Sequence, residues 1–195
     1  MNNKPFLVPK ALTLYQEEIK KSVFITQLKH TSSITEAKTF IEYVKNQHAT
    51  ARHNCWGFSD DGEPSGTAGK PILAQLSGSG VGEITAVVSR YYGGIKLGTG
   101  GLVRAYGGSV QKALKLLQTI EKKITTKLLL QLDYGFVAIV QGLLVQFDAQ
   151  EVEADYSQQV KMVVDIEQRY VSDFTQSVIN KSGAKILVTP LGDKQ

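Results

Sequence analysis

The chain has 195 residues and a mass of 21.3 kDa, enough for one ordinary domain or two small ones. Its composition, 42% hydrophobic and 21% charged, is typical of globular proteins and excludes wholesale disorder and a collagen-like architecture. The single cysteine, Cys55, excludes an internal disulfide framework and an all-cysteine zinc site, and it fits a reducing compartment. The most apolar stretch, residues 128–147, contains three glutamines and one aspartate, which is too polar for a membrane span. With no secretory signal expected in the first residues, we predict a cytoplasmic protein without a membrane partner.

Positive charge and glycine are concentrated in the first part of the chain. Residues 1–120 carry 14 Lys and Arg against 8 Asp and Glu, whereas residues 121–195 carry 8 against 10. Fourteen of the 18 glycines also precede residue 120, so we predict two domains, residues 1–120 and 121–195. A basic first domain favours an anionic partner such as RNA, a nucleotide or phosphate, although solvated lysines on helix faces explain the same bias.

The pattern of apolar residues predicts an α+β fold in both domains. In the first domain we expect strands at residues 11–19, 22–30, 51–58 and 83–92 and helices at 67–76 and 99–118. A further helix begins at Ser33, which forms a capping box with Glu36. The second domain has predicted strands at 124–134, 151–157, 160–168 and 184–189 and helices at 136–148 and 171–182. This βαββαβ order matches the split-βαβ pattern of ferredoxin-like domains.

A glycine-rich segment between the strand at 83–92 and the following helix is the most unusual part of the sequence. Free backbone N–H groups and the positive end of a helix hold anions at such a position. The candidate anion- or nucleic-acid-binding residues are Arg90, Tyr91, Tyr92, Gly93, Gly94, Lys96, Gly98, Thr99, Gly100, Gly101 and Arg104. The strict nucleotide motifs fail, because Thr99 replaces the P-loop lysine and Val103 replaces the last glycine of the dinucleotide fingerprint. A tight turn with close helix packing is the alternative interpretation.

Two other segments carry side chains of the types that bind metal ions or act as nucleophiles. Asp60, Asp61 and Glu63 are weak candidates for a divalent-cation site such as one for Mg²⁺, although Asp and Gly also form turns unaided. His53 and Cys55 share one face of a strand, which suits a thiol nucleophile with a base but equally a buried, inert cysteine. These five residues, together with Arg52 and Lys70, are candidates for a cleft, and we expect no resident cofactor or metal.

Three segments resemble the signature of the IMPACT family in its bacterial YigZ-type form. They are RHNC at residues 52–55, SDDGEPSGTAGKP at 59–71 and VVSRYYGGIKLGTGGL at 87–102. The resemblance implies a first domain with the fold of domain 2 of ribosomal protein S5, which elongation factor G also uses, and a ferredoxin-like second domain. Eukaryotic relatives regulate translation by contacting a ribosome-associated activator of a stress kinase. In contrast to the family pattern, only residues 56–59 separate Cys55 from Asp60, so the strand is expected to turn directly into the loop.

These observations lead to one main functional expectation and two alternatives. We expect a non-enzymatic, translation-linked protein whose basic first domain binds RNA, the ribosome or another phosphate-bearing partner. One alternative is a metal-dependent phosphate-ester or nucleotide hydrolase that uses the carboxylates of residues 60–63. The other is an adaptor whose second domain presents a sheet face to a protein partner.

Overall fold

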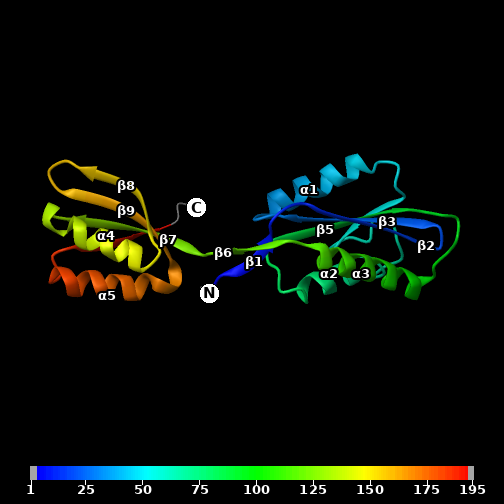
Figure 1. Ribbon diagram of the computed structural model, residues 1–195. Coiled ribbons are helices and arrows are strands. Elements are labelled where there is room, and N and C mark those ends of the chain that lie inside the picture. The colour runs from blue at the N-terminus through cyan, green and yellow to red at the C-terminus, as the bar shows by residue number, and fades with distance from the viewer. Residues whose placement is uncertain (1–3, 193–195) are drawn as a thin grey trace. The chain divides into compact units, whose positions relative to one another are not determined.

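The computed structural model describes residues 4–192, and these residues divide into two compact units (Figure 1). Residues 6–122 form the first unit, and residues 4–5 together with 123–192 form the second. Both units combine helices with antiparallel sheets, so the predicted α+β class is confirmed. Within the described range, none of the helices has both the length and the apolar character that crossing a bilayer requires.

The first unit is built on a four-stranded antiparallel sheet with the strand order β2-β3-β5-β4. In that order the strands are β2 (Thr13–Ile19), β3 (Ser22–His30), β5 (Ile84–Tyr91) and β4 (His53–Trp56). Helix α1 (Ile34–Gln47) covers one face of the sheet, and helices α2 (Gly69–Ser77) and α3 (Thr99–Leu116) cover the other (Figure 1). Because both faces are covered, residues 86–90 of β5 are buried without interruption.

Successive residues of β5 point into two separate cores, one on each face of the sheet. Val87 packs with α1 through Phe40, Ile41 and Val44. The next residue, Val88, belongs to the larger core under α2 and α3, whose members also include Phe24, Leu28, Ile72, Ala105, Tyr106 and Val110. The strand that carries Arg90 is therefore held rigidly from both sides.

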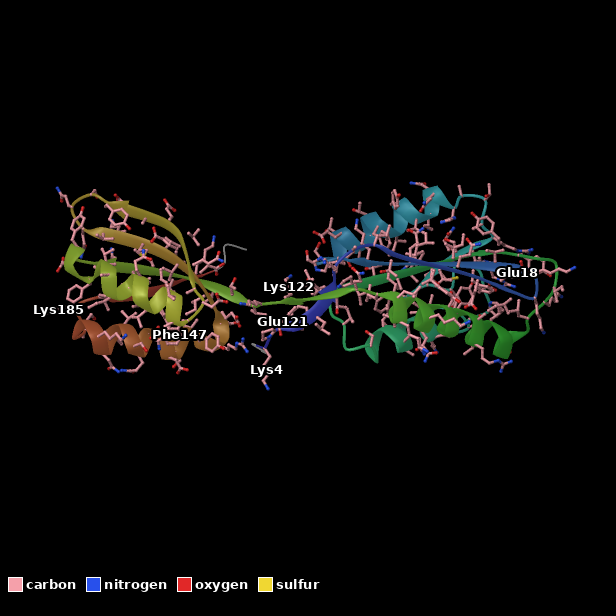
Figure 2. All side chains as sticks on the ribbon, in the orientation of Figure 1. Lys4, Glu18, Glu121, Lys122, Phe147 and Lys185 are labelled. Carbon is pink, nitrogen blue, oxygen red and sulfur yellow. The ribbon has the colours of Figure 1, made fainter. Side chains whose placement is uncertain are left out.

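A small second sheet of the first unit was not predicted from the sequence. Strand β1 (Phe6–Pro9) pairs antiparallel with β6 (Thr119–Lys122), and α3 ends two residues earlier than the predicted 118. Lys122, labelled in Figure 2, places its ammonium nitrogen 2.7 Å from a carboxylate oxygen of Glu83. Burial opposes ionisation of Glu83, but hydrogen bonds from Lys122 and His30 outweigh it and lower the pKa of this carboxyl. This contact ties β6 to the start of β5.

The second unit contains its elements in the order expected from the sequence. They are β7 (Thr125–Leu132), α4 (Val137–Gln146), β8 (Gln150–Tyr156), β9 (Val160–Glu167), α5 (Val171–Ser182) and β10 (Leu187–Leu191). Short 3-10 turns, Tyr134–Phe136 and Gln168–Tyr170, precede the two helices. The antiparallel sheet has the order β10-β7-β9-β8. Its core includes Phe174, against which Phe147 packs edge-on at 5.6 Å between ring centroids (Figure 2).

Several element boundaries differ from the sequence prediction for local reasons. Strand β4 ends at Trp56 instead of residue 58, because Trp56 and Ser59 exchange two backbone hydrogen bonds across a tight turn. The strand therefore turns directly into the following loop, as the short spacing before Asp60 predicted. Strand β10 begins at Leu187 instead of residue 184, because Gly183 and Ala184 both have positive φ angles at the end of α5.

Candidate functional site

A cavity of about 470 Å³ in the first unit gathers residues from all three segments that the sequence analysis selected. It is bordered by β4, the loop that follows it, the end of β5 and the start of α3. The predicted site residues that line it are Arg52, His53, Glu63, Arg90, Tyr92, Lys96, Gly98 and Thr99. We call this cavity the arginine pocket, after Arg90.

Sheet register brings the first two segments together. His53 on β4 lies directly opposite Arg90 on β5 in the antiparallel ladder, so both side chains leave the same face of the sheet. The loop after β4 then returns Glu63 to this face, where an oxygen of its carboxylate is 2.5 Å from Nη1 of Arg90. The spacing of these residues along the chain does not reveal this contact.

Arg90 is the most buried cation of the pocket. Its Nη1 donates to Glu63 and its Nη2 donates to the hydroxyl of Ser22 at 3.3 Å. The hydroxyl of Tyr106 donates to the same Glu63 oxygen at 2.9 Å. The Nε of Arg90 is buried and has no hydrogen-bond partner among residues 4–192. A buried donor without a partner is costly and calls for an explanation.

His53 has one ring nitrogen fixed by the protein and the other turned toward Glu63. Its Nδ1 lies 2.7 Å from the carbonyl oxygen of Asp61. Because a carbonyl only accepts, Nδ1 must carry a proton and donate it in this bond. The Nε2 lies 3.8 Å from the carboxylate of Glu63. The ring is thus oriented with Nε2 available for exchange of a proton or a hydrogen bond with a ligand.

The N-terminus of α3 supplies backbone donors at the mouth of the pocket. Gly98 caps the helix with a φ of 74°, and no side chain of the described residues forms a capping hydrogen bond there. The first intrahelical bond runs from Leu102 N–H to the Gly98 carbonyl, so the N–H groups of residues 99–101 have no acceptor within the helix. The first turn contains no acidic residue. This end of the helix is therefore electropositive and open to an anion.

The two tyrosines of the glycine-rich segment lie in different environments. The ring of Tyr92 lines the pocket, with the guanidinium carbons of Arg52 and Arg90 at 5.2 and 5.4 Å from its centroid. Tyr91 instead places its hydroxyl 2.9 Å from Nδ1 of His48, outside the pocket. Burial lowers the pKa of His48. Of these two candidates for base stacking, Tyr92 therefore borders the arginine pocket and Tyr91 does not.

The remaining residues of the glycine-rich segment lie outside the pocket lining. A Cβ on Gly93 would stand 1.9 Å from the backbone oxygen of Lys21, so this glycine permits close packing of two turns. Gly94 has a φ of 84° and open space around it. Arg104 borders a separate, smaller cavity beside Lys20. Gly100 and Gly101 contribute backbone to the first turn of α3 and do not line the pocket.

The environment of Cys55 argues against a nucleophilic thiol. Its side chain is fully buried, its Sγ donates to the carbonyl of Asp60 at 3.0 Å, and it lies 3.4 Å from the hydroxyl of Tyr106. Burial raises the pKa of the Cys55 thiol to about 12. The thiolate that catalysis requires is therefore disfavoured near neutral pH, and the two ring nitrogens of His53 face Asp61 and Glu63.

The three candidate metal ligands bind three different sets of protein groups. Asp60 accepts hydrogen bonds from the N–H groups of Gly66, Ala68 and Gly69, which lead into α2. Asp61 accepts from the N–H of Asn54 at 2.6 Å, while Glu63 pairs with Arg90. Within residues 4–192, no group of three or more His, Cys, Asp or Glu side chains is arranged to hold a metal ion. Lys70 is exposed beside Gly66 and also lies outside the pocket.

Sequence reasoning missed two residues that hold the buried part of the site. Tyr106 has the spacing of a core residue of α3 and is packed edge-on against Phe24, yet its hydroxyl contacts Glu63. The sequence signal for a role in the site was its phenol group, because the hydroxyl of a buried tyrosine requires a hydrogen-bond partner. Ser22, which accepts from Arg90, gives no such signal because serine also begins many strands and turns.

A larger cavity, of about 650 Å³, lies elsewhere in the first unit. It is bordered by α1, α2 and the start of β5, and most of the side chains that line it are apolar. None of the candidate site residues reaches it. The candidate side chains that can bind an anion or exchange a proton therefore line the arginine pocket and not this larger cavity.

Comparisons with known proteins agree on one family for this chain. Residues 20–114 match the family described as the Impact N-terminal domain, and residues 130–185 match a domain of unknown function, DUF1949. The protein described as IMPACT family member YigZ, from Escherichia coli, is 49% identical over 190 residues, which cover 91% of this chain and 93% of the relative. An IMPACT family member of Haemophilus influenzae is 43% identical over 196 residues, covering 94% and 95%. A solved structure titled as that of a hypothetical protein is similar with a TM-score of 0.70 at 45% identity, covering 98% of this chain and 99% of that one.

Proposed function

The chain belongs to the IMPACT family, and from this premise we propose that it is a translation-linked regulator that binds RNA, the ribosome or another phosphate-bearing partner. The partner's phosphate would occupy the arginine pocket of the first unit. The observation that carries this proposal is that Arg90 lines the same cavity as the open N-terminus of α3.

The charge of the pocket supports an anionic ligand. Three cationic side chains, those of Arg52, Arg90 and Lys96, line it together with one carboxylate, that of Glu63. The 18-residue helix α3 adds the equivalent of about half a positive charge at its N-terminus. Lys96 and Arg52 are exposed, so they attract an anion from solvent, whereas Arg90 is positioned to hold it.

The proposal is for binding and not for catalysis. The protonated thiol of Cys55 and the separate partners of Asp60, Asp61 and Glu63 support neither the nucleophile nor the metal centre of the alternative readings. His53 is the remaining group able to exchange a proton, and it is oriented by a backbone carbonyl. In this proposal it contacts the ligand without transferring a group to it.

We also propose the finer fold assignments that the family resemblance implies. The first unit would have the S5 domain-2-like fold. The second would be ferredoxin-like, which is supported by its βαββαβ order and by the sheet order β10-β7-β9-β8. The family resemblance relates both folds to domains of elongation factor G, but a fold alone does not assign a function.

Binding of short single-stranded RNA and purified ribosomes by the full-length protein tests the proposal, at two salt concentrations. Lys96→Glu removes a cation from the pocket, and Arg104→Glu makes the same charge change on the first turns of α3 outside it. We expect Lys96→Glu to weaken binding and to reduce the salt dependence by about one phosphate contact, with a much smaller effect of Arg104→Glu. The absence of RNA and ribosome binding, or equal losses in both variants, would overturn the proposal.

A further inference from the structure

We propose that the arginine pocket recognises a terminal phosphate monoester, at the end of an RNA strand or on a nucleotide, and not a phosphate within a nucleic-acid chain. This inference rests on the proposed function and names its ligand. Four features of the pocket carry it: the depth of its main donor, the number of its donors, its charge and the orientation of His53.

The depth of Arg90 favours a phosphate with a single substituent. Arg90 lines the pocket and is only 4% exposed. An internal phosphodiester carries a sugar on each side, and both sugars would have to enter the cavity before a phosphate oxygen reached this guanidinium. A monoester enters with its free oxygens first and leaves its one substituent at the mouth.

The donors of the pocket come from three residues. Arg90 contributes its guanidinium, Thr99 its hydroxyl and backbone N–H, and Lys96 an ammonium group. An internal phosphodiester has two unsubstituted oxygens, whereas a monoester has three. Three free oxygens allow each of these three residues to pair with an oxygen of its own, and each pairing involves at least one charged partner.

The charge of the pocket also matches a monoester. The cationic side chains outnumber the single carboxylate by two, before the helix N-terminus is counted. A phosphate monoester carries roughly −1.5 to −2 at neutral pH, and a diester carries only one negative charge. A diester would leave part of this positive charge without a counterpart close by.

The available nitrogen of His53 suits a ligand that exchanges a proton. Its Nδ1–H is committed to the carbonyl of Asp61, which leaves Nε2 on the side of Glu63 and the pocket. A phosphate monoester gains or loses its last proton near pH 6, whereas an internal diester has none to exchange there. Nε2 can therefore accept a hydrogen bond from the protonated monoester or donate one to the dianion.

The test compares four probes with the full-length protein under one buffer condition. They are a ten-nucleotide RNA with a 5′-phosphate, the same RNA with a 3′-phosphate, the same RNA with hydroxyl groups at both ends, and adenosine 5′-monophosphate. We expect at least one phosphorylated end to bind tenfold or more tightly than the hydroxyl-ended RNA. Adenosine monophosphate that binds as tightly as the phosphorylated RNA would also support the inference and would assign the ligand to free nucleotides.

The outcomes separate this inference from the proposed function. Equal affinity for the phosphorylated and hydroxyl-ended RNA would overturn the terminal-phosphate inference and leave RNA binding intact. Failure of all four probes to bind would overturn the terminal-phosphate inference, and only failure of purified ribosomes to bind as well would overturn the proposed function. His53→Gln should reduce the preference for the phosphorylated end at least fivefold, whereas the control Arg104→Gln should preserve it. Thermal unfolding of both variants checks that the fold is retained, and an unchanged preference in folded His53→Gln would contradict the role of His53.

Discussion

Arg90 and Glu63 form an ion pair inside the first unit, with 2.5 Å between Nη1 and Oε1 and exposed fractions of only 4% and 8%. The pair joins β5 to the loop that follows β4. Tyr106 donates a hydrogen bond to Glu63, and Ser22 accepts one from Arg90. Burying two charges is costly. Removing one partner of such a pair lowers the stability of the protein strongly, because the other charge is left buried without compensation. Glu63 thus holds Arg90 in place while reducing the positive charge of the pocket.

Replacing Glu63 with glutamine should change stability and ligand affinity in opposite directions. Glu63→Gln leaves the Arg90 charge uncompensated, so we expect the free energy of unfolding to fall by about 3 kcal/mol. The same change removes the only carboxylate among the described residues that line the pocket, so affinity for phosphate-terminated RNA should rise about tenfold, or about 1.4 kcal/mol. Urea denaturation and calorimetric titration measure the two effects. The control Glu83→Gln alters a carboxylate outside the pocket and should not raise affinity; an unchanged or weaker affinity in Glu63→Gln would contradict the anion assignment.

The two adjacent glycines at the end of β5 should respond differently to alanine. In Gly93→Ala the new methyl group would collide with the backbone of Lys21, and we expect a loss of about 3 kcal/mol or more in unfolding free energy. In Gly94→Ala nothing lies within 4 Å, and the cost is that of a positive φ, about 1–2 kcal/mol. Urea denaturation of both variants measures the difference. A larger loss in Gly94→Ala would show that the turn of Lys21 does not pack against Gly93 as described.

Cys55 should be unreactive in the folded protein. Because burial raises the pKa of its thiol to about 12, we expect negligible labelling by a thiol reagent at pH 8 in native buffer and complete labelling in denaturant. The labelling rate should follow global unfolding. Cys55→Ser should keep the RNA affinity of the unaltered protein within twofold. Rapid, stoichiometric labelling of folded protein would reopen a chemical role for this residue.

Asp60 should make stability depend on acid pH. Burial opposes its ionisation, but hydrogen bonds from Gly66, Gly69 and Ala68 prevail and lower the pKa of Asp60 below its ordinary 3.8. A carboxyl with a lowered folded-state pKa contributes its stabilisation in full above the unfolded value and loses it as the pH falls through the folded value. Asp60→Asn should therefore lower the unfolding free energy by about 2 kcal/mol at pH 7, and the difference from the unaltered protein should shrink below about pH 4.

Urea denaturation between pH 7 and pH 2.5 measures this dependence. Asp61→Asn is the matched control, because Asp61 accepts one backbone N–H at 2.6 Å where Asp60 accepts three. At pH 7, Asp61→Asn should lower the free energy of unfolding less than Asp60→Asn does. A difference between Asp60→Asn and the unaltered protein that is constant over the whole pH range would contradict the account of the Asp60 hydrogen bonds.

Local sequence patterns predicted most elements of the fold well. Helix α5 runs over the predicted residues 171–182, and Ser33 caps α1 by accepting from the N–H of Glu36 at 3.2 Å. The side chain of Glu36 accepts a hydrogen bond from the N–H of Ser32 instead of that of Ser33, so the expected capping box is shifted by one residue. These features depend on residues a few positions apart, which a sequence displays directly.

Features that depend on distant residues could not be predicted in the same way. The pairing of β1 with β6 joins four-residue strands more than 100 residues apart, and such short strands show no clear alternation of apolar side chains. The contact between Glu63 and Arg90 depends on the register of β4 against β5 and on the path of a loop. The sequence therefore identified most residues that line the pocket, but not their convergence or the part played by Tyr106.

The most direct test of the arginine pocket is an NMR titration of ¹⁵N-labelled protein with 5′-phosphorylated RNA. We expect the largest shifts at the backbone amides of Gly98 and Thr99 and at the guanidinium of Arg90, because these residues line the arginine pocket. Shifts confined to the surface around Arg104, or to the second unit, would contradict the pocket as the binding site.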